Sequence, residues 1–115
     1  MQIRVTKPLT DLQNDNYNKL KEDLYNFIII TNDFPEWKQA NFLDNWSSLA
    51  VKELSVTLLP TELIEKNYIE SVREWKNNLL AERDRVKVDI FAATDIAGIR
   101  TAIDSFTYTN MPVKP

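Results

Sequence analysis

The sequence predicts an all-α domain of three or four helices. Apolar residues recur every three or four positions over long stretches, prolines stand where two of these stretches begin, and the 115 residues include a single glycine. Such spacing gathers apolar side chains on one face of a helix, which then packs against a neighbour. Short connections favour antiparallel packing, so we expect one domain that spans residues 1–115.

The first helix is expected over residues 15–31. The polar residues 10–16 that overlap its start are typical of a loop. The β-branched residues 28–31 weaken helix propensity at its end, and residues 32–33 then form a turn. The apolar stripe consists of Tyr17, Leu20, Leu24, Phe27 and Ile28.

The second helix is expected to begin near Pro35. Proline suits the first position of a helix, so Asp33 or Phe34 would be the capping residue. The apolar face of this helix is wide, and we therefore expect it to be the most buried of the helices.

The third helix is expected to start at Pro60 or Thr61 and to continue through Arg83 toward Asp89. Its far end is ambiguous, because residues 86–90 alternate like a strand. A short last helix follows, with Thr94 and Asp95 as candidate caps. Its apolar face comprises Ile96, Ile99, Ala102, Ile103 and Phe106.

The two ends of the chain have different patterns. Residues 1–14 form an N-terminal arm in which residues 1–7 alternate like a short β-strand, whereas residues 107–115 are expected to be an extended tail. The strand could pair with residues 55–59 or 106–109, or with a partner protein's sheet. A rival α+β fold pairs residues 1–7 with residues 87–91.

The composition excludes most catalytic chemistry. The chain has no histidine and no cysteine, so a Ser-His-Asp triad, a cysteine nucleophile and the usual zinc sites cannot be built. Gly98 alone cannot form a phosphate-binding loop, which needs several glycines. We therefore expect no enzyme activity, no cofactor and no bound metal.

Charge and hydropathy limit the partners. The formal net charge is −3 and no run of Lys and Arg occurs, which argues against nucleic acid. The longest dense apolar stretch, residues 27–30, is too short to cross a membrane. Other proteins are the partners that we expect, and we expect the protein to be soluble.

One cluster of acidic residues could bind a metal ion or act as a pair of acid and base. Glu82, Asp84 and Asp89 alternate with basic residues. Opposite charges side by side are more typical of a solvated surface whose charges neutralise one another. The basic neighbours are Arg83, Arg85 and Lys87.

Candidate partner-binding residues lie at two places. Trp37 is nearest a helix start and is the tryptophan expected to be exposed, whereas Trp46 and Trp75 are more typical of a core. The tail could dock as an extended peptide, which its prolines pre-organise, or be a frayed end. If it docks, its removal should leave the fold intact. The candidate tail residues are Tyr108, Met111, Pro112, Val113 and Pro115.

Part of the chain resembles a known family. Residues 72–84 read Val-Arg-Glu-Trp-Lys-Asn-Asn-Leu-Leu-Ala-Glu-Arg-Asp. This stretch resembles the C-terminal part of phage tail assembly chaperone proteins, where an Arg-rich helix runs into Leu-Leu-Ala-Glu and a following Asp. The family's later Tyr-Arg-x-Ala-Leu helix corresponds to residues 99–103, and its Trp-Pro-x-Lys-Pro ending to residues 111–115. The resemblance covers residues 71–115.

Three positions depart from the family pattern. Arg85, Ile99 and Met111 stand where the family has Trp, Tyr and Trp, and the segment between the two helices is shorter. The resemblance implies a viral protein that assembles or builds a tail through contacts with viral tail components, in the host cytoplasm or the virion. It implies no catalytic residue. The alternative is a regulatory or inhibitory module that binds a host protein, and homo-oligomer formation is also open.

Overall fold

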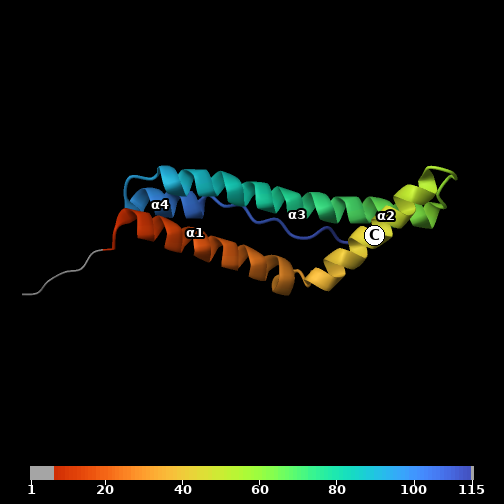
Figure 1. Cartoon of the computed structure of the whole chain (residues 1–115), viewed down its shortest axis with the longest axis horizontal. Coiled ribbons are helices and arrows are strands. Elements are labelled where there is room, and N and C mark those ends of the chain that lie inside the picture. The colour runs from red at the N-terminus through yellow and green to blue at the C-terminus, as the bar shows by residue number, and fades with distance from the viewer. Residues whose placement is uncertain (1–6, 115) are drawn as a thin grey trace, which may run out of the picture. The chain divides into compact units, whose positions relative to one another are not determined.

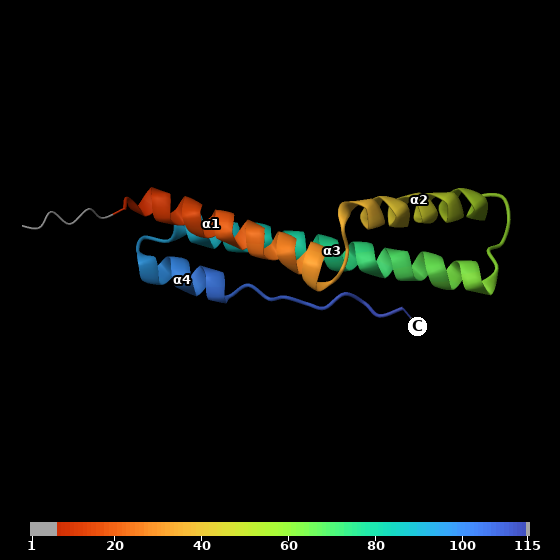
Figure 2. The ribbon, with the colours of Figure 1, turned by 90° about the horizontal axis from the view of Figure 1, so that it is seen from below.

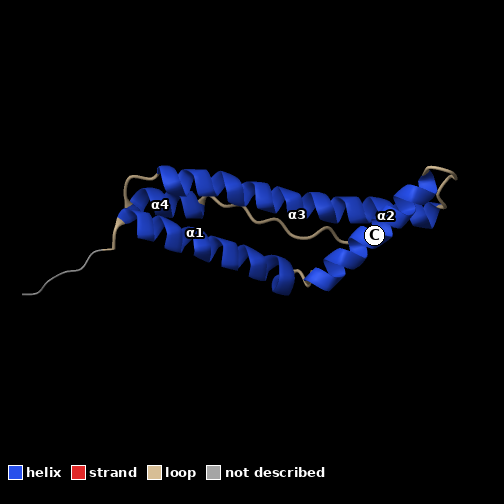
Figure 3. Cartoon of the chain, in the orientation of Figure 1, coloured by secondary structure: helices blue, strands red, loops and turns tan. Residues whose placement is uncertain are grey.

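The chain is mainly helical in the part that its computed structural model describes, residues 7–114. Four α-helices follow one another: α1 (Leu9–Asn26), α2 (Glu36–Glu53), α3 (Pro60–Ala92) and α4 (Ile96–Asp104), with a π-helical turn η1 (Phe27–Thr31) directly after α1 (Figure 1). No strand occurs within residues 7–114 (Figure 3). The prediction of an all-α fold is therefore confirmed. The predicted N-terminal strand falls almost wholly on residues 1–6, which lie outside the described residues.

Two compact units make up the described chain. The first unit combines residues 7–24 with Leu79–Tyr108, and the second combines Tyr25–Asn78 with residues 109–114. Nothing in the composition marks this division, because α1 and α3 both contribute residues to each unit. The expectation of a single domain stays a prediction.

The core of the first unit lies among α1, the last part of α3, and α4. Leu20, Val86, Ile90 and Ala102 are buried together. Tyr17, Ile103 and Phe106 pack against this cluster as half-buried neighbours. One helix face from each of three elements thus supplies the core, as the spacing in the sequence predicts.

Helix α1 begins earlier than predicted, and residues 10–16 are helical rather than a loop. The Pro8 carbonyl accepts hydrogen bonds from the Asp11 and Leu12 amides, which closes the first turn. The buried Gln13 side chain explains the rest. Its amide nitrogen donates to the carbonyl oxygens of Ile90 and Ala93, at 3.2 and 3.1 Å. It thereby adds a donor at the end of α3, where the Ile90 carbonyl also accepts from the Ala93 amide at 3.3 Å.

The rival α+β fold is wrong, because the segment that would form its second strand belongs to α3. Val86 and Ile90 are buried and lie one helical turn apart, whereas Val88 between them is exposed. The alternation of Val86, Val88 and Ile90 fits a strand, but the burial of two residues four positions apart, with the residue between them exposed, fits a helix. The other proposed strand partners, residues 55–59 and 106–109, are not strands either.

The short helix α4 begins at the predicted cap. Asp95 is the N-cap residue, and its side chain accepts a hydrogen bond from the Gly98 amide at 2.8 Å. Gly98 lies inside the helix, where glycine normally weakens it. A Cβ atom at this position would lie 3.1 Å from the Ala93 Cβ, so the glycine allows the preceding turn to approach closely.

Aromatic side chains dominate the core of the second unit. The Phe34 ring meets the Phe42 ring edge to face, with centroids 5.1 Å apart, and the Trp75 ring at 6.3 Å. Phe42 in turn contacts Tyr68 at 6.0 Å. These contacts join α2 to the first part of α3, which run side by side as a hairpin (Figure 2). The hairpin therefore depends on edge-to-face packing as well as on aliphatic burial.

A compact turn separates η1 from α2, as predicted for residues 32–33. The Asn32 amide side chain donates to the Phe27 carbonyl at 2.9 Å, which caps the π-helical turn. Asp33 has a φ of 47°, a left-handed conformation that Asp tolerates better than most residues. The N-cap of α2 is Pro35, rather than Asp33 or Phe34 as predicted.

The expectation that α2 is the most buried helix is wrong. None of its residues is buried. Phe42, Trp46 and Leu49 are half-buried on one side, whereas Trp37 and Val51 are among the exposed residues. A helix that is apolar on several faces can be central in a core or can offer one face to a partner, and periodicity alone does not separate the two.

The contact of Gln13 with α3 gives a first prediction. Gln13→Ala should lower the free energy of unfolding by about 1 kcal/mol, because it removes the side-chain hydrogen bonds that join α1 to the end of α3. Urea unfolding followed by circular dichroism measures the change. Asn14→Ala, at the exposed neighbouring position, is the matched control and should be nearly neutral. Equal effects of the two substitutions would contradict this role for Gln13.

Candidate protein-binding surfaces

An exposed aliphatic patch lies at the tip of the α2–α3 hairpin in the second unit. We call Leu54, Val56, Leu59 and Leu63 the tip patch. Leu54 is 87% exposed, and the other three are also largely open to solvent. Leu54, Val56 and Leu63 line a shallow hollow of about 500 Å³, and Leu59 lies one turn before Leu63. Contiguous exposed aliphatic surface of this kind is typical of a protein contact.

The charges beside the tip patch neutralise one another. Lys52 pairs with Glu62 at 2.7 Å, and Lys66 pairs with Glu53 at 3.2 Å. Glu62 also accepts a hydrogen bond from the Leu59 amide at 3.0 Å, which caps the start of α3. The Lys52 ammonium and this amide together hold the pKa of Glu62 below its ordinary value. The tip is therefore apolar with little net charge around it.

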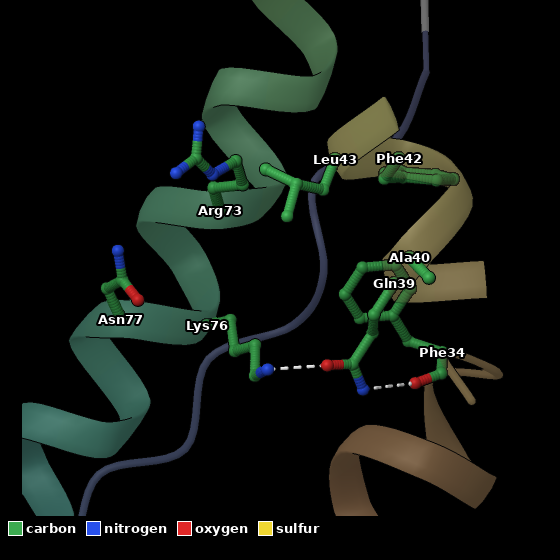
Figure 4. Close-up of a pocket in the computed structure, with 8 residues that line it drawn as sticks. All are labelled: Phe34, Gln39, Ala40, Phe42, Leu43, Arg73, Lys76 and Asn77. Carbon is green, nitrogen blue, oxygen red and sulfur yellow. Dashed lines mark hydrogen bonds between the residues drawn. The ribbon is translucent and has the colours of Figure 1, made fainter. Parts of the chain in front are cut away.

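A second hollow lies between α2 and α3, nearer the start of α2 (Figure 4). Its volume is about 280 Å³. Lys76 points from α3 toward α2 and donates a hydrogen bond to the Gln39 side-chain oxygen, while the Gln39 nitrogen donates to the Phe34 carbonyl at 2.8 Å. We call this hollow the Lys76 pocket. Its lining residues are Phe34, Gln39, Ala40, Phe42, Leu43, Arg73, Lys76 and Asn77.

The end of the C-terminal tail is bound to its own chain within the second unit. The Trp75 indole nitrogen donates to the Thr109 carbonyl at 2.6 Å, and the Met111 amide donates to the Asn32 side chain at 3.1 Å. Lys114 pairs with Glu65 and lies over the Tyr68 ring. The tail is extended, as predicted, but these contacts hold it against α3 and the η1 turn. A docked segment of this kind is not a frayed end.

The predicted partner-binding residues that the structure describes are divided between the two units. Trp37 is 66% exposed on α2, in agreement with its predicted exposure. Tyr108 belongs to the first unit, where its ring packs on Phe106 and burial raises the pKa of its hydroxyl. Met111 and Pro112 are half-buried, and Val113 is 90% exposed. Pro115 lies outside the described residues.

The other two tryptophans have different environments. Trp75 is buried in the aromatic core, as predicted. Trp46 is only half-buried, and its indole nitrogen donates to Glu70 at 3.1 Å while Arg73 lies over its ring. Trp46 therefore borders the hairpin interface rather than filling a core.

The acidic cluster near the end of α3 is paired with arginine. Arg85 pairs with both Glu82 and Asp89, and Arg83 pairs with Asp84. Arg85 also donates to the Ser105 carbonyl at 3.0 Å, which ties α3 to the end of α4. The interpretation of the cluster as a self-neutralised surface is confirmed by these contacts. Among residues 7–114, no group of three or more acidic side chains is arranged to hold a metal ion.

Sequence reasoning missed the tip patch and the special position of Lys76. Residues 55–59 were interpreted as a possible strand partner, although Leu54, Val56, Leu58 and Leu59 crowd into six residues. So many apolar residues in a short connection cannot all face a core, which is the signal that could have found the patch. Nothing in the sequence distinguishes Lys76 from other lysines, because its contact with Gln39 bridges two helices.

The comparisons with known proteins add no family to this geometry. Searches against protein-family models, curated protein sequences and solved structures found no match. In the described part of the chain, no helix combines the length and the apolar character needed to cross a membrane.

The ion pair at the tip gives a prediction about pH. Because the folded pKa of Glu62 lies below its ordinary value of 4.5, its stabilising contribution is present above about pH 4.5 and is lost as pH falls through the folded pKa. Carboxyl-carbon NMR titration should give a midpoint for Glu62 that rises in Lys52→Met. The control Lys21→Met should leave it unchanged. A midpoint that does not respond to Lys52→Met would show that the pair is absent in solution.

The docked tail gives a prediction about stability. Deletion of residues 109–115 should lower the free energy of unfolding by about 1–2 kcal/mol, because Trp75 loses both a hydrogen bond and cover from water. The expectation that the fold stays intact without the tail stays a prediction, now with a lower free energy of unfolding. Urea unfolding, together with the Trp75 indole N–H signal in NMR spectra, tests this. Val113→Ser, at an exposed position, should change neither, and full stability of the truncated chain would refute the docking.

Proposed function

We propose that this protein is non-enzymatic and acts by binding other proteins through the tip patch. The observation that carries the proposal is the group of exposed aliphatic side chains around a hollow, flanked by ion pairs that cancel. Burial of apolar surface stabilises an interface by about 25 cal/mol per Å² before the costs of association. Four aliphatic residues at one end of a hairpin therefore offer a compact anchor for a partner.

We propose further that the partners are viral tail components and that the protein helps to assemble or build a phage tail. The support is the sequence resemblance over residues 71–115. Leu79 in α3 and Ala102 in α4 both match the family pattern, and both are buried. Matched residues that are buried would preserve the packing of the helices, and the exposed residues would then bind the partner. This function places the protein in the host cytoplasm or the virion.

The alternative is a module that binds and inhibits a host protein. That hypothesis relies on an acidic surface that attracts a basic partner. Many carboxylates of the described residues already pair with lysine or arginine, which weakens such attraction. The apolar tip accounts for binding without an unpaired acidic surface. The identity of the bound partner separates the two hypotheses.

A photo-crosslinking experiment tests the proposal. A photoreactive p-benzoylphenylalanine in place of Leu54 should crosslink, in the infected host cell, to a defined viral structural protein that mass spectrometry identifies. The same group at Asn78 is the matched control. That residue is also exposed, but it lies 15 residues along α3 from Leu63, or roughly 22 Å. A host protein crosslinked at the tip would support the alternative. Crosslinking that is equal at both positions, or absent from both, would reject the tip as the binding surface.

A further inference from the structure

Lys76 differs from the other lysines of the described chain in what its ammonium contacts. Six lysines form ion pairs with carboxylates, and two others lie over the Tyr17 ring. Lys76 instead contacts the neutral amide of Gln39. The ion-paired lysines are Lys7, Lys19, Lys38, Lys52, Lys66 and Lys114, and those over the ring are Lys21 and Lys87.

The Lys76 ammonium donates to a neutral oxygen, although the side chain as a whole is half-buried. A carboxylate in the place of that oxygen would add the attraction of opposite charges to the hydrogen bond. Arg73 adds a second cation at the rim, on the same helix one turn before Lys76, and it forms no ion pair among the described residues (Figure 4). The Lys76 pocket is therefore a local centre of positive charge on a chain of net charge −3.

Four of the other lining residues are apolar, beside the polar Gln39 and Asn77. Phe34 and Phe42 form its aromatic part, while Ala40 and Leu43 line it from α2. Leu43 is about half exposed, so this wall is open to a ligand. An occupant that fits both parts carries a negative charge beside a large apolar side chain.

We propose that the Lys76 pocket binds a segment of a partner protein in which an aspartate or glutamate stands next to a large apolar residue. The carboxylate accepts hydrogen bonds from Lys76, and the apolar side chain packs against Phe42 and Leu43. At about 280 Å³ the hollow is just below the usual range of pockets that enclose a small molecule, about 300–1,000 Å³. It has room for one or two side chains of an extended segment, and the charge complementarity selects an acidic one.

Among residues 7–114, no carboxylate forms an ion pair with Lys76. Four glutamates of the second unit have other partners: Glu53 and Glu70 both contact Lys66, Glu62 contacts Lys52, and Glu65 contacts Lys114. An external carboxylate would therefore compete only with the amide of Gln39. The inference names a second surface beyond the tip patch, and its test does not use the tip.

The test uses two blocked tetrapeptides, acetyl-Leu-Asp-Phe-Asp-amide and its uncharged counterpart acetyl-Leu-Asn-Phe-Asn-amide. NMR titration of the full chain follows the Gln39 side-chain amide and the Trp46 indole N–H. We expect the acidic peptide to bind about tenfold more tightly than the uncharged one, since a charge-assisted hydrogen bond is lost in the latter. Both signals should shift with the acidic peptide.

Two variants and one small anion make the result decisive. Lys76→Met keeps the alkyl chain and should remove the preference for the acidic peptide, whereas Lys21→Met, an exposed lysine of α1, should retain it in full. Thermal unfolding confirms that each variant is folded. Equal binding of the two peptides, or a preference that survives Lys76→Met, would overturn the proposal. So would sodium acetate alone binding as tightly as the acidic peptide, because the apolar part of the pocket would then contribute nothing.

Discussion

Burial of one continuous face of α3 is the constraint on which the rest of the structure depends. Ile69 and Val72 of this helix are fully buried in the second unit, and Val86 and Ile90 are fully buried in the first. This helix has 33 residues, and most of its stability comes from packing against the other elements rather than from the helix propensity of its residues. Every other element of the described chain, including the end of the tail, packs against part of it. Side chains also bond backbone groups near both ends of α3. Glu62 accepts a hydrogen bond from the Leu59 amide at the start, and Gln13 donates to the Ile90 carbonyl at the end.

Much of this fold was predictable from local signals, because those signals report local physics. Pro60 and Asp95 mark helix starts through backbone geometry and capping, which need no tertiary contact. The early start of α1 was not predictable in the same way. Gln13 sits among Asn and Asp residues that favour loops, and its helical state depends on carbonyls 77 to 80 positions away. The exposure of α2 was missed for a related reason. Apolar residues on a helix indicate that its face is covered, but they do not show whether the chain itself or a partner covers it.

The same distinction applies to the candidate surfaces: features set by neighbouring residues were predicted, and contacts between residues far apart in the sequence were not. The exposure of Trp37 followed from its place near a helix start, and the extended form of the tail followed from its prolines. The contact between Trp75 and Thr109 bridges 34 positions, so the docking of the tail on its own chain could not be predicted. Lys76 is a sharper case. The residue is ordinary in the sequence, and only the packing of α2 against α3 gives it a neutral partner and an apolar neighbourhood.

The two surfaces of the hairpin differ in the physics by which they would choose a partner. The tip patch offers aliphatic area with its charges cancelled, so it provides affinity with little discrimination and little dependence on salt. The Lys76 pocket offers a cation beside apolar side chains, so under the proposal it would select a segment that carries a carboxylate. A partner that meets both would be selected by the pocket and retained by the tip. Under the two proposals, the hairpin would thus divide its work, with selection at the pocket and retention at the tip.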